Sequence, residues 1–248
     1  MLLGIDKIVI LETVDSTNNY AMAMIQKGEA IDGNAIFARQ QTNGKGRRGK
    51  EWKSNKGDNI ILSIMAQMQW LPVSKLFEPG VAVALGCHDF VSKHVALNTY
   101  IKWPNDIFIN DSKAGGILIE NVIKGTLWQW SVIGVGININ QVIFEDYNIS
   151  PISLKQITGN DYNVLQMAEE LYTFVLKRLN DLKAGFFSKM LEEYNEKLYA
   201  KGRQTKFRKQ NIVFETEIIG ISPSGQLITR DSLERRFNFD EVEFLGIV

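Results

Sequence analysis

Residues 99–139 read TYIKWPNDIFINDSKAGGILIENVIKGTLWQWSVIGVGINI, and this stretch decides the fold of the chain. Four short apolar runs within it have the length and composition of β-strands. They cover residues 99–103, 107–109, 116–123 and 127–139. Turn-forming residues at 110–113 and 124–125 separate the later runs, as they do in β-hairpins. The stretch therefore predicts consecutive strands joined by tight turns.

Strand-like and helical segments flank this stretch in the sequence. The strands expected before it are 8–11, 34–39 and 60–68, and the helices are 19–27, ended by Gly28, and 77–94. After it, apolar residues at helical spacing between Leu165 and Leu179 predict a helix capped by Asn163. Residues 186–199 predict a further helix.

A change of composition marks the last part of the chain. Residues 205–248 hold short β-type segments with a turn at 222–225. A segment of about 45 residues is near the lower limit for independent folding, so we expect a small β-barrel or sandwich. The predicted domains are 1–200 and 201–248.

The composition excludes several classes of function. Lys+Arg and Asp+Glu both number 28, so there is no global attraction to DNA or anionic lipid. Cys87 is the only cysteine, and His88 and His94 are the only histidines, which argues against disulfides and against a metal site of such ligands. No segment approaches the ~20 apolar residues of a membrane span, and the run before Asp6 is too short for a signal peptide. We therefore expect a cytoplasmic protein that contacts no membrane.

The segment 40–58 has no apolar periodicity, and its residues 41–52 read QTNGKGRRGKEW. Glycine permits close backbone approach to a ligand and positive φ, and successive N–H groups can cradle an anion. The arginines add bidentate donors for carboxylate or phosphate, and Trp52 offers a flat face for stacking. Composition alone favours a solvated basic loop, or a nucleic-acid patch. The rest of the chain has to decide between these and a ligand-binding loop.

The residues of this loop match two nucleotide-binding motifs, but the residues around them do not fit either motif. Gly44–Gly49 spells G-x-G-x-x-G, but residues 54–58 break the helix that should follow. Gly44–Lys50 spells most of a P-loop, but Glu51 stands where Ser or Thr would bind magnesium. Both matches are accidental.

Five separated motifs together resemble the catalytic core of bacterial biotin–protein ligases, in the order and spacing of that family. They are Asp15–Asn18, the loop at 41–52, Lys102–Asp106, Lys113–Glu120 and Gly134–Asn140. Each motif is common when taken singly, whereas the set is specific. The resemblance covers nearly the whole chain, including the C-terminal β-module.

The resemblance implies an α+β fold and a ligase activity. The fold is a mixed, largely antiparallel sheet packed with helices, of the class II aminoacyl-tRNA synthetase-like type, followed by an SH3-like β-barrel. The activity is ATP-dependent: biotin and ATP, with Mg²⁺, form biotinyl-5′-AMP, and biotin passes to a lysine of a biotin carboxyl carrier protein. A sheet-mediated homodimer is compatible with the resemblance, and the oligomeric state and the carrier stay open.

The resemblance also assigns roles to residues. Those matching the biotin-binding groups are Ser16, Thr17, Asn18, Gln41, Gly44, Lys45, Gly46, Arg47, Lys113, Gly115 and Gly116. Those matching nucleotide-binding groups are Arg47, Arg48, Trp52, Asn105 and Asn138. The catalytic candidates are Arg47, Lys113 and Asp106. Chemically, a buried urea needs both donors and acceptors, and two reacting anions need cations beside them. The ligands of Mg²⁺ stay open.

Several of these residues also admit purely structural roles. Lys113 fits an exposed lysine of a hairpin turn, and Ser16 with Thr17 fits a helix cap. Gly134 and Gly136 fit glycines that relieve crowding in a strand. These alternatives stay open at the level of sequence.

The chain departs from the family pattern at three places. Lys45 stands where arginine is usual, which keeps the charge but loses the bidentate fork. Gly115 follows Ala114 where the common pattern has a larger residue before Ala-Gly. Family members that repress transcription carry a helix-turn-helix before the Ser-Thr motif, and here 15 residues precede Ser16. We therefore expect a ligase without repressor activity.

Three other functions compete with this one. A lipoate–protein ligase or octanoyltransferase on a related fold would use the same acyl-to-lysine logic. A nucleic-acid binder would use the basic loop, although the zero net charge argues against it. A scaffold protein is disfavoured by five polar motifs on loops.

Overall fold

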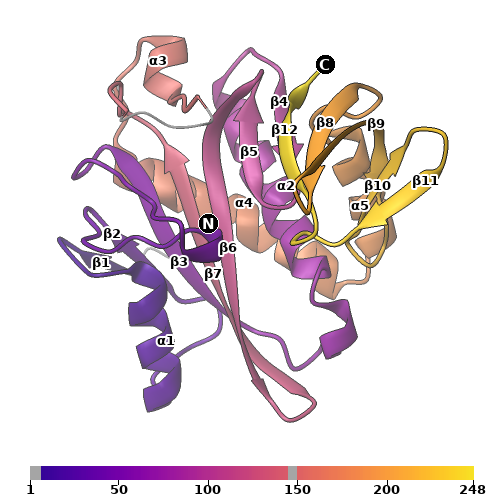
Figure 1. Cartoon of the computed structure of the whole chain (residues 1–248). Helices are drawn as coiled ribbons and strands as arrows, with labels where there is room; N and C mark the ends of the chain where they lie inside the picture. Colours follow the sequence, from indigo (N-terminus) through magenta and orange to yellow (C-terminus); the bar gives the residue numbers. More distant parts are fainter. Residues whose placement is uncertain (1–6, 145–149) are drawn as a thin grey trace.

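The computed structural model describes residues 7–144 and 150–248, and shows two β-sheets with helices packed against them (Figure 1). The larger sheet has seven strands in the order β1-β2-β3-β7-β6-β5-β4. They are β1 (Ile8–Leu11), β2 (Ala35–Ala38), β3 (Asn59–Gln67), β4 (Thr99–Lys102), β5 (Asp106–Ile109), β6 (Ser112–Lys124) and β7 (Leu127–Asn138). β1 and β2 are parallel, and the other neighbouring strands of this sheet are antiparallel. The expected mixed, largely antiparallel sheet is confirmed.

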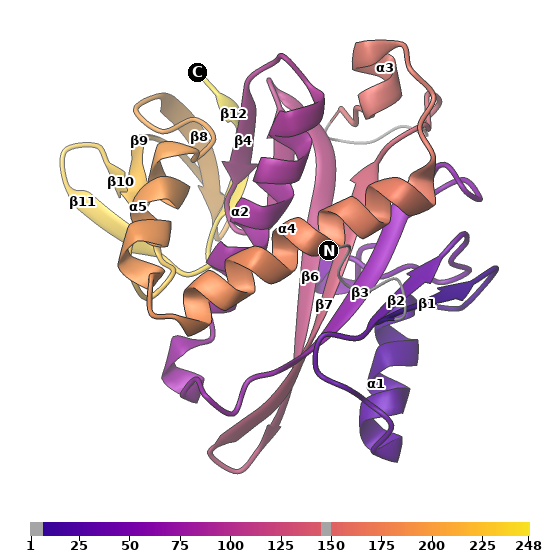
Figure 2. The same cartoon turned by 180° about the vertical axis from the view of Figure 1, so that it is seen from behind.

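Helices pack on both faces of this sheet. The helices of the described residues are α1 (Thr17–Lys27), α2 (Glu78–His94), α3 (Leu154–Thr158), α4 (Val164–Lys183) and α5 (Phe187–Glu196), with 3-10 turns η2 (Arg47–Gly49) and η3 (Val73–Lys75). Of these, α1, α2 and α4 contact the strands of this sheet. α2 and α4 cross one face (Figure 2). α1 contributes Ala21 to a small cluster with Ile36, Met65 and Val132. Because side chains alternate along a strand, Phe37, next to Ile36, belongs instead to the main core on the α2 and α4 side.

A second, antiparallel sheet of five strands follows α5, in the order β11-β10-β9-β8-β12. Its strands are β8 (Gln204–Lys209), β9 (Ile212–Ile221), β10 (Leu227–Arg230), β11 (Glu234–Phe237) and β12 (Glu243–Ile247). The arrangement is consistent with an SH3-like module, but within the described residues β11 and β12 do not pair, so the expected closed barrel is not seen. The edge strand β11 is short and carries Glu234, Arg235 and Arg236, and charged edges resist further pairing.

The second sheet is anchored on the first part of the chain at two points. Asn195 of α5 accepts a hydrogen bond from the amide of Ile221 at 2.6 Å and donates to its carbonyl at 3.2 Å. The indole of Trp103 donates to the carbonyl of Gly225 at 3.0 Å. Gly225 has a φ of 89°, and a Cβ there would lie 2.5 Å from the ring of Phe77. Only glycine therefore fits this contact between the sheets.

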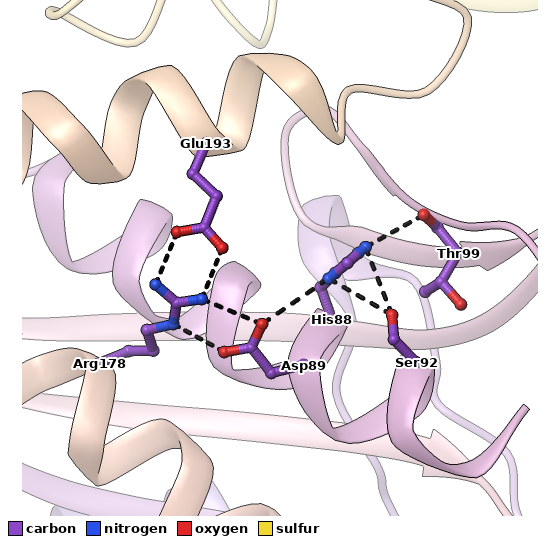
Figure 3. Close-up of polar contacts among 6 residues, drawn as sticks. All are labelled: His88, Asp89, Ser92, Thr99, Arg178 and Glu193. Atoms are coloured by element: carbon purple, nitrogen blue, oxygen red, sulfur yellow. Dashed lines mark hydrogen bonds and ion pairs between the residues drawn. The ribbon is translucent and has the colours of Figure 1, made fainter.

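A polar cluster ties three helices together behind the large sheet (Figure 3). Arg178 of α4 donates two hydrogen bonds to Asp89 of α2, at 2.7 and 3.0 Å. It donates two more to Glu193 of α5, at 2.8 and 2.6 Å. Beside it, Nε2 of the buried His88 lies 3.1 Å from the carbonyl of Thr99. This cluster fixes α5, the helix that leads into the second sheet.

Most predicted elements are confirmed, and a few boundaries are wrong. The first helix begins at Thr17 rather than at residue 19, and α3 was not predicted. β6 begins at Ser112 rather than at 116, because its first residues pair with β5. One continuous core includes residues of both sheets, and the division at residue 200 stays a prediction.

The described helices include none that is long and apolar enough to cross a membrane. The N-terminal run considered for a signal peptide, residues 1–6, lies outside the described residues.

Candidate active site

The glycine-rich loop folds back on itself beside the large sheet. The amide of Trp52 donates to the carbonyl of Gly44 at 2.9 Å. A Cβ on Gly44 would lie 2.3 Å from the carbonyl oxygen of Trp52, so this closure requires glycine. Positive φ angles occur at Arg48, 56°, and at Gly49, 71°. The glycines of the loop thus serve a close approach at Gly44 and a chain reversal at Gly49.

Two glycines of β7 make room for side chains that lie across the sheet. A Cβ on Gly136 would lie 2.5 Å from Cε2 of Trp52, and a Cβ on Gly134 would lie 2.5 Å from Oδ1 of Asn18. Their spacing of two residues puts both on the same face of the strand. The indole nitrogen of Trp52 is buried and has no hydrogen-bond partner within the described part of the chain. The two glycines therefore seat specific side chains, which is more than relief of crowding.

A buried chain of hydrogen bonds connects the first motif with β3. Oε1 of Gln41 accepts from the amide of Thr17 at 2.8 Å and from its hydroxyl at 3.1 Å. The hydroxyl of Ser63 lies 2.7 Å from Oγ1 of Thr17 and 2.6 Å from Oδ1 of Asn18. Ser16 is buried next to them as the N-cap of α1, although its side chain makes no capping bond. Sequence reasoning missed Ser63, whose signal is a polar residue inside an apolar strand.

Glu120 of β6 extends this chain toward the loop. Its Oε2 accepts from Nδ2 of Asn18 at 2.7 Å, and its Oε1 lies 4.0 Å from the ammonium of Lys45. Lys45 also donates to Oδ1 of Asn19 at 2.5 Å. The lysine that replaces the usual arginine thus ties the loop to α1 and β6. Glu120 belongs to a recognised motif, but sequence reasoning assigned it no role.

The predicted catalytic residues gather near the ends of β5 and β6. Nζ of Lys113 lies 2.7 Å from Oδ1 of Asp106. A Cβ on Gly116 would be 3.5 Å from each of these two atoms, so Gly116 leaves the pair uncovered. The guanidinium of Arg47 donates to Oδ1 of Asn105 at 3.3 Å. Lys113 lies within a strand and is partly buried, so its interpretation as an exposed turn lysine is wrong.

The loop also reaches the second sheet. Arg48 donates to Oδ1 of Asp240 at 2.9 Å and to the carbonyl of Phe239 at 2.9 Å. The guanidinium carbon of Arg47 lies 5.1 Å from the ring centre of Phe239, and burial lowers the pKa of Arg47. Phe239 and Asp240 precede β12 and carry no local motif, which is why sequence reasoning missed them.

An open hollow of about 640 Å³ lies against the loop. Its lining comprises residues 43–51 of the loop, Leu118 and Glu120 of β6, and Asp240. Gly44, Lys45, Gly46, Arg47 and Arg48 therefore share one recess. Its volume suits a small molecule.

Two predicted site residues serve the backbone of the sheet in this structure. Nδ2 of Asn138 donates to the carbonyls of Lys113, at 3.3 Å, and Ile152, at 3.1 Å. Gly115 packs so tightly that a Cβ would lie 2.7 Å from the carbonyl oxygen of Gly136. Asn138 thereby fixes the strand that carries Lys113, and its contact with a nucleotide stays a prediction.

Lys102, at the end of β4, lies near Asp106 and Lys113, and sequence reasoning gave it no role. Its ammonium lies 4.7 Å from the ring centre of Phe108 and 4.5 Å from that of Phe244. Burial lowers the pKa of Lys102 to about 8; Asp106 opposes this shift and Lys113 adds to it. Strongly shifted lysines cluster at functional sites. The signal in the sequence was its place in the motif that ends at Asp106.

Most residues of this site lie within the segment that a known family model matches. They include the glycine-rich loop, the hydrogen-bonded residues between Thr17 and Glu120, and the cations Arg47, Lys102 and Lys113. The model of the biotin/lipoate A/B protein ligase family matches residues 10–138, just over half of the chain. The chain belongs to this family. The protein is therefore a ligase, and the five motifs lie almost entirely inside the matched segment.

Individual relatives agree with this assignment. The biotin--[acetyl-CoA-carboxylase] ligase of Mycobacterium tuberculosis is 33% identical over 135 residues, which are 53% of this ligase and 49% of that protein. The bifunctional ligase/repressor BirA of Bacillus spizizenii is 25% identical over 237 residues, 94% of this ligase and 73% of that protein.

A solved structure supports the fold over nearly the whole length. The biotin protein ligase from Aquifex aeolicus, in complex with biotin and ATP, aligns with a TM-score of 0.81 at 22% identity. The alignment covers 96% of this ligase and 98% of that chain. At this identity the likeness establishes the shared fold, including the second sheet.

Proposed function

We propose that this ligase activates biotin with ATP and transfers it to a lysine of a biotin carboxyl carrier protein. The observation that carries the proposal is the buried chain of Gln41, Thr17, Ser63 and Asn18, which gathers donors and acceptors in one place. The ureido ring of biotin needs both kinds of partner, whereas the dithiolane ring of lipoate offers neither. Relatives named as biotin ligases support the same choice.

The cations of the site suit the first step of this reaction. A carboxylate oxygen of biotin attacks the α-phosphorus of ATP, a new phosphorus–oxygen bond forms, and pyrophosphate leaves. Because two anions must meet, positive groups are needed beside them. Arg47 and Lys113 would supply this charge, and the ion pair of Lys113 with Asp106 at 2.7 Å supports a role of Asp106 in holding the lysine.

The second step forms the amide bond to the carrier. The lysine nitrogen of the carrier attacks the carbonyl of biotinyl-5′-AMP, and AMP leaves with the bonding electrons. The attacking amine loses a proton, for which Asp106 or bulk water is the acceptor. The loop at 44–52 would keep water from the reactive anhydride while it waits for the carrier.

Magnesium is proposed as part of the substrate MgATP. The described residues contain no group of three or more His, Cys, Asp or Glu side chains that could hold a metal ion. Magnesium is commonly bound through one or two carboxylates and the phosphates of its substrate. Its protein ligands stay open.

Further parts of the proposal concern partners and domains. Residues 1–200 would form the catalytic domain and 201–248 the second domain, in a cytoplasmic enzyme without repressor activity. A gel-shift assay tests the last point, since a specific complex with operator DNA would contradict it. Sedimentation of the protein with and without ligands decides whether it forms a homodimer.

Pyrophosphate release from the purified protein tests the proposed function. It should depend on MgATP and biotin, and the mass of an added carrier domain should rise by one biotin. Lys113→Ala should strongly reduce both, while Lys124→Ala, which removes an exposed lysine at the end of β6, should reduce neither. Release with lipoate in place of biotin would keep the family and change the substrate. Release with neither acid would contradict the proposal.

A further inference from the structure

We propose that Phe244 is a positioning residue for Lys102, through which the C-terminal sheet holds a third cation at the reacting centre. The inference rests on the proposed function, because it assigns Lys102, beside Arg47 and Lys113, to anionic reactants. It gives residues 201–248 a specific task in the chemistry.

Lys102 is enclosed by aromatic rings from two separate sheets. Phe108 lies on β5, in the hairpin that carries Lys102, with its ring centre 4.7 Å from the ammonium. Phe244 lies on β12 of the second sheet, with its ring centre 4.5 Å from the same atom. The two rings come from positions 136 residues apart in the chain, so the cage exists only when the second sheet is docked.

The ring of Phe244 is itself held by neighbours. Phe207 of β8 meets it edge to face at 5.5 Å between ring centres, and Tyr199 meets it at 6.0 Å. Tyr199 in turn contacts the ring of Phe108 at 4.9 Å. The four rings therefore form one connected group, and Lys102 is the cation that it encloses. Such a group holds its geometry better than a single exposed ring.

The ion pairs of the site do not hold Lys102 in place by themselves. The charged groups that face it are Asp106 of β5, Lys113 of β6 and Lys50 of the loop. Asp106 already pairs with Lys113 at 2.7 Å, and the other two groups repel Lys102. A lysine side chain is flexible, and a ring face attracts an ammonium by about 0.5–2 kcal/mol. The aromatic rings thus restrain the side chain of Lys102, because the carboxylate of Asp106 is already paired with Lys113.

A double-mutant cycle on the full chain separates this role from ordinary packing of the second sheet. Phe244→Leu removes the ring and keeps an apolar side chain, and Lys102→Met removes the charge. KM for ATP and kcat are measured from pyrophosphate release in the presence of biotin, for the wild type, both single variants and the double variant. Phe237→Leu is the control, since Phe237 is a buried ring of the same sheet that also lies beside a lysine, 5.2 Å from the ammonium of Lys209.

We expect Phe244→Leu to raise KM for ATP about tenfold, in line with the loss of one cation–π contact. In the Lys102→Met background the same change should have little further effect, and Phe244→Trp should restore activity because it restores a ring. Phe237→Leu should leave KM for ATP unchanged. Equal effects of Phe244→Leu in both backgrounds would overturn the inference, as would a Phe237→Leu defect of the same size.

The cycle also distinguishes the inference from the proposed function. If the wild-type protein releases pyrophosphate with lipoate alone, the proposed substrate is wrong and the cycle is run with lipoate, where coupling of Phe244 to Lys102 still supports the cage. If it releases pyrophosphate with biotin and the two effects add, the function stands and the cage is wrong. Release with neither acid would overturn both.

Discussion

The ammonium of Lys113 lies 2.7 Å from Oδ1 of Asp106, across two neighbouring strands and beside a glycine that leaves the pair uncovered. A partly exposed charged pair can exchange one partner for a substrate anion with little rearrangement. Asp106 then serves to hold the lysine ready, and Lys113 serves to neutralise the charge that builds up on the reactants.

Loss of that charge should be costly. Lys113→Ala should lower kcat for pyrophosphate release by about 10²–10³, the usual cost of removing one group that stabilises a transition-state charge. Lys113→Arg keeps the charge and should lose less. Quenched-flow measurement of the first turnover reports on this step. A Lys113→Ala variant that matches the wild type would remove Lys113 from the chemistry.

The contact between Trp52 and Gly136 should affect the KM for ATP. Gly136→Ala places a Cβ 2.5 Å from Cε2 of Trp52 and should displace the indole. If Trp52 is a wall of the adenine site, KM for ATP should rise about tenfold, because stacking on an aromatic ring is worth about 1–3 kcal/mol per base.

A second substitution decides whether Trp52 transmits the effect. In a Trp52→Ala background, Gly136→Ala should raise KM no further. Gly80→Ala is the control, since a Cβ at that helical position would meet no atom within 4 Å. A Gly136→Ala defect that persists without Trp52 would place its cause in the strand.

Sequence patterns predicted this site as far as its residues lie in compact motifs. Asp106 and Lys113 are separated by one hairpin, so a local motif brings them together. Phe239 and Asp240 reach the loop only because the second sheet docks nearby, and no spacing in the sequence encodes that contact. Lys102 belongs to a motif that the sequence shows, but its aromatic cage depends on Phe244, which lies far along the chain.

Tertiary packing also explains the errors in secondary structure. Ser112 and Lys113 of β6 looked like part of a turn because they are polar and follow Asn110 and Asp111, yet they pair with β5. The helix α3 was missed because five residues carry too little periodicity, although its capping box at Ser153 and Gln156 is a usable signal.

The cluster around Arg178 should contribute to stability rather than to chemistry. Arg178→Met leaves Asp89 and Glu193 without their shared partner in a partly buried place, and should lower the free energy of unfolding by about 2 kcal/mol. Urea unfolding measures this. Arg208→Met removes an exposed pair with Glu243 and should change stability by less than about 0.5 kcal/mol. Equal effects of the two substitutions on the free energy of unfolding would show that the cluster around Arg178 stabilises the protein no more than an exposed ion pair does.

The pH dependence of ATP use should report the charge of Lys102. A lysine is cationic below its pKa and neutral above it, and burial lowers the pKa of Lys102 to about 8. KM for ATP should therefore be lowest below that pH. It should rise as the pH passes through it, because Lys102 loses the positive charge that attracts the anionic reactants. Lys102→Arg stays charged throughout this range and should flatten the alkaline rise. An alkaline rise in KM that persists unchanged in Lys102→Arg would assign the titration to another group of the site or to the substrate. The charge of Lys102 would then have no effect on KM for ATP.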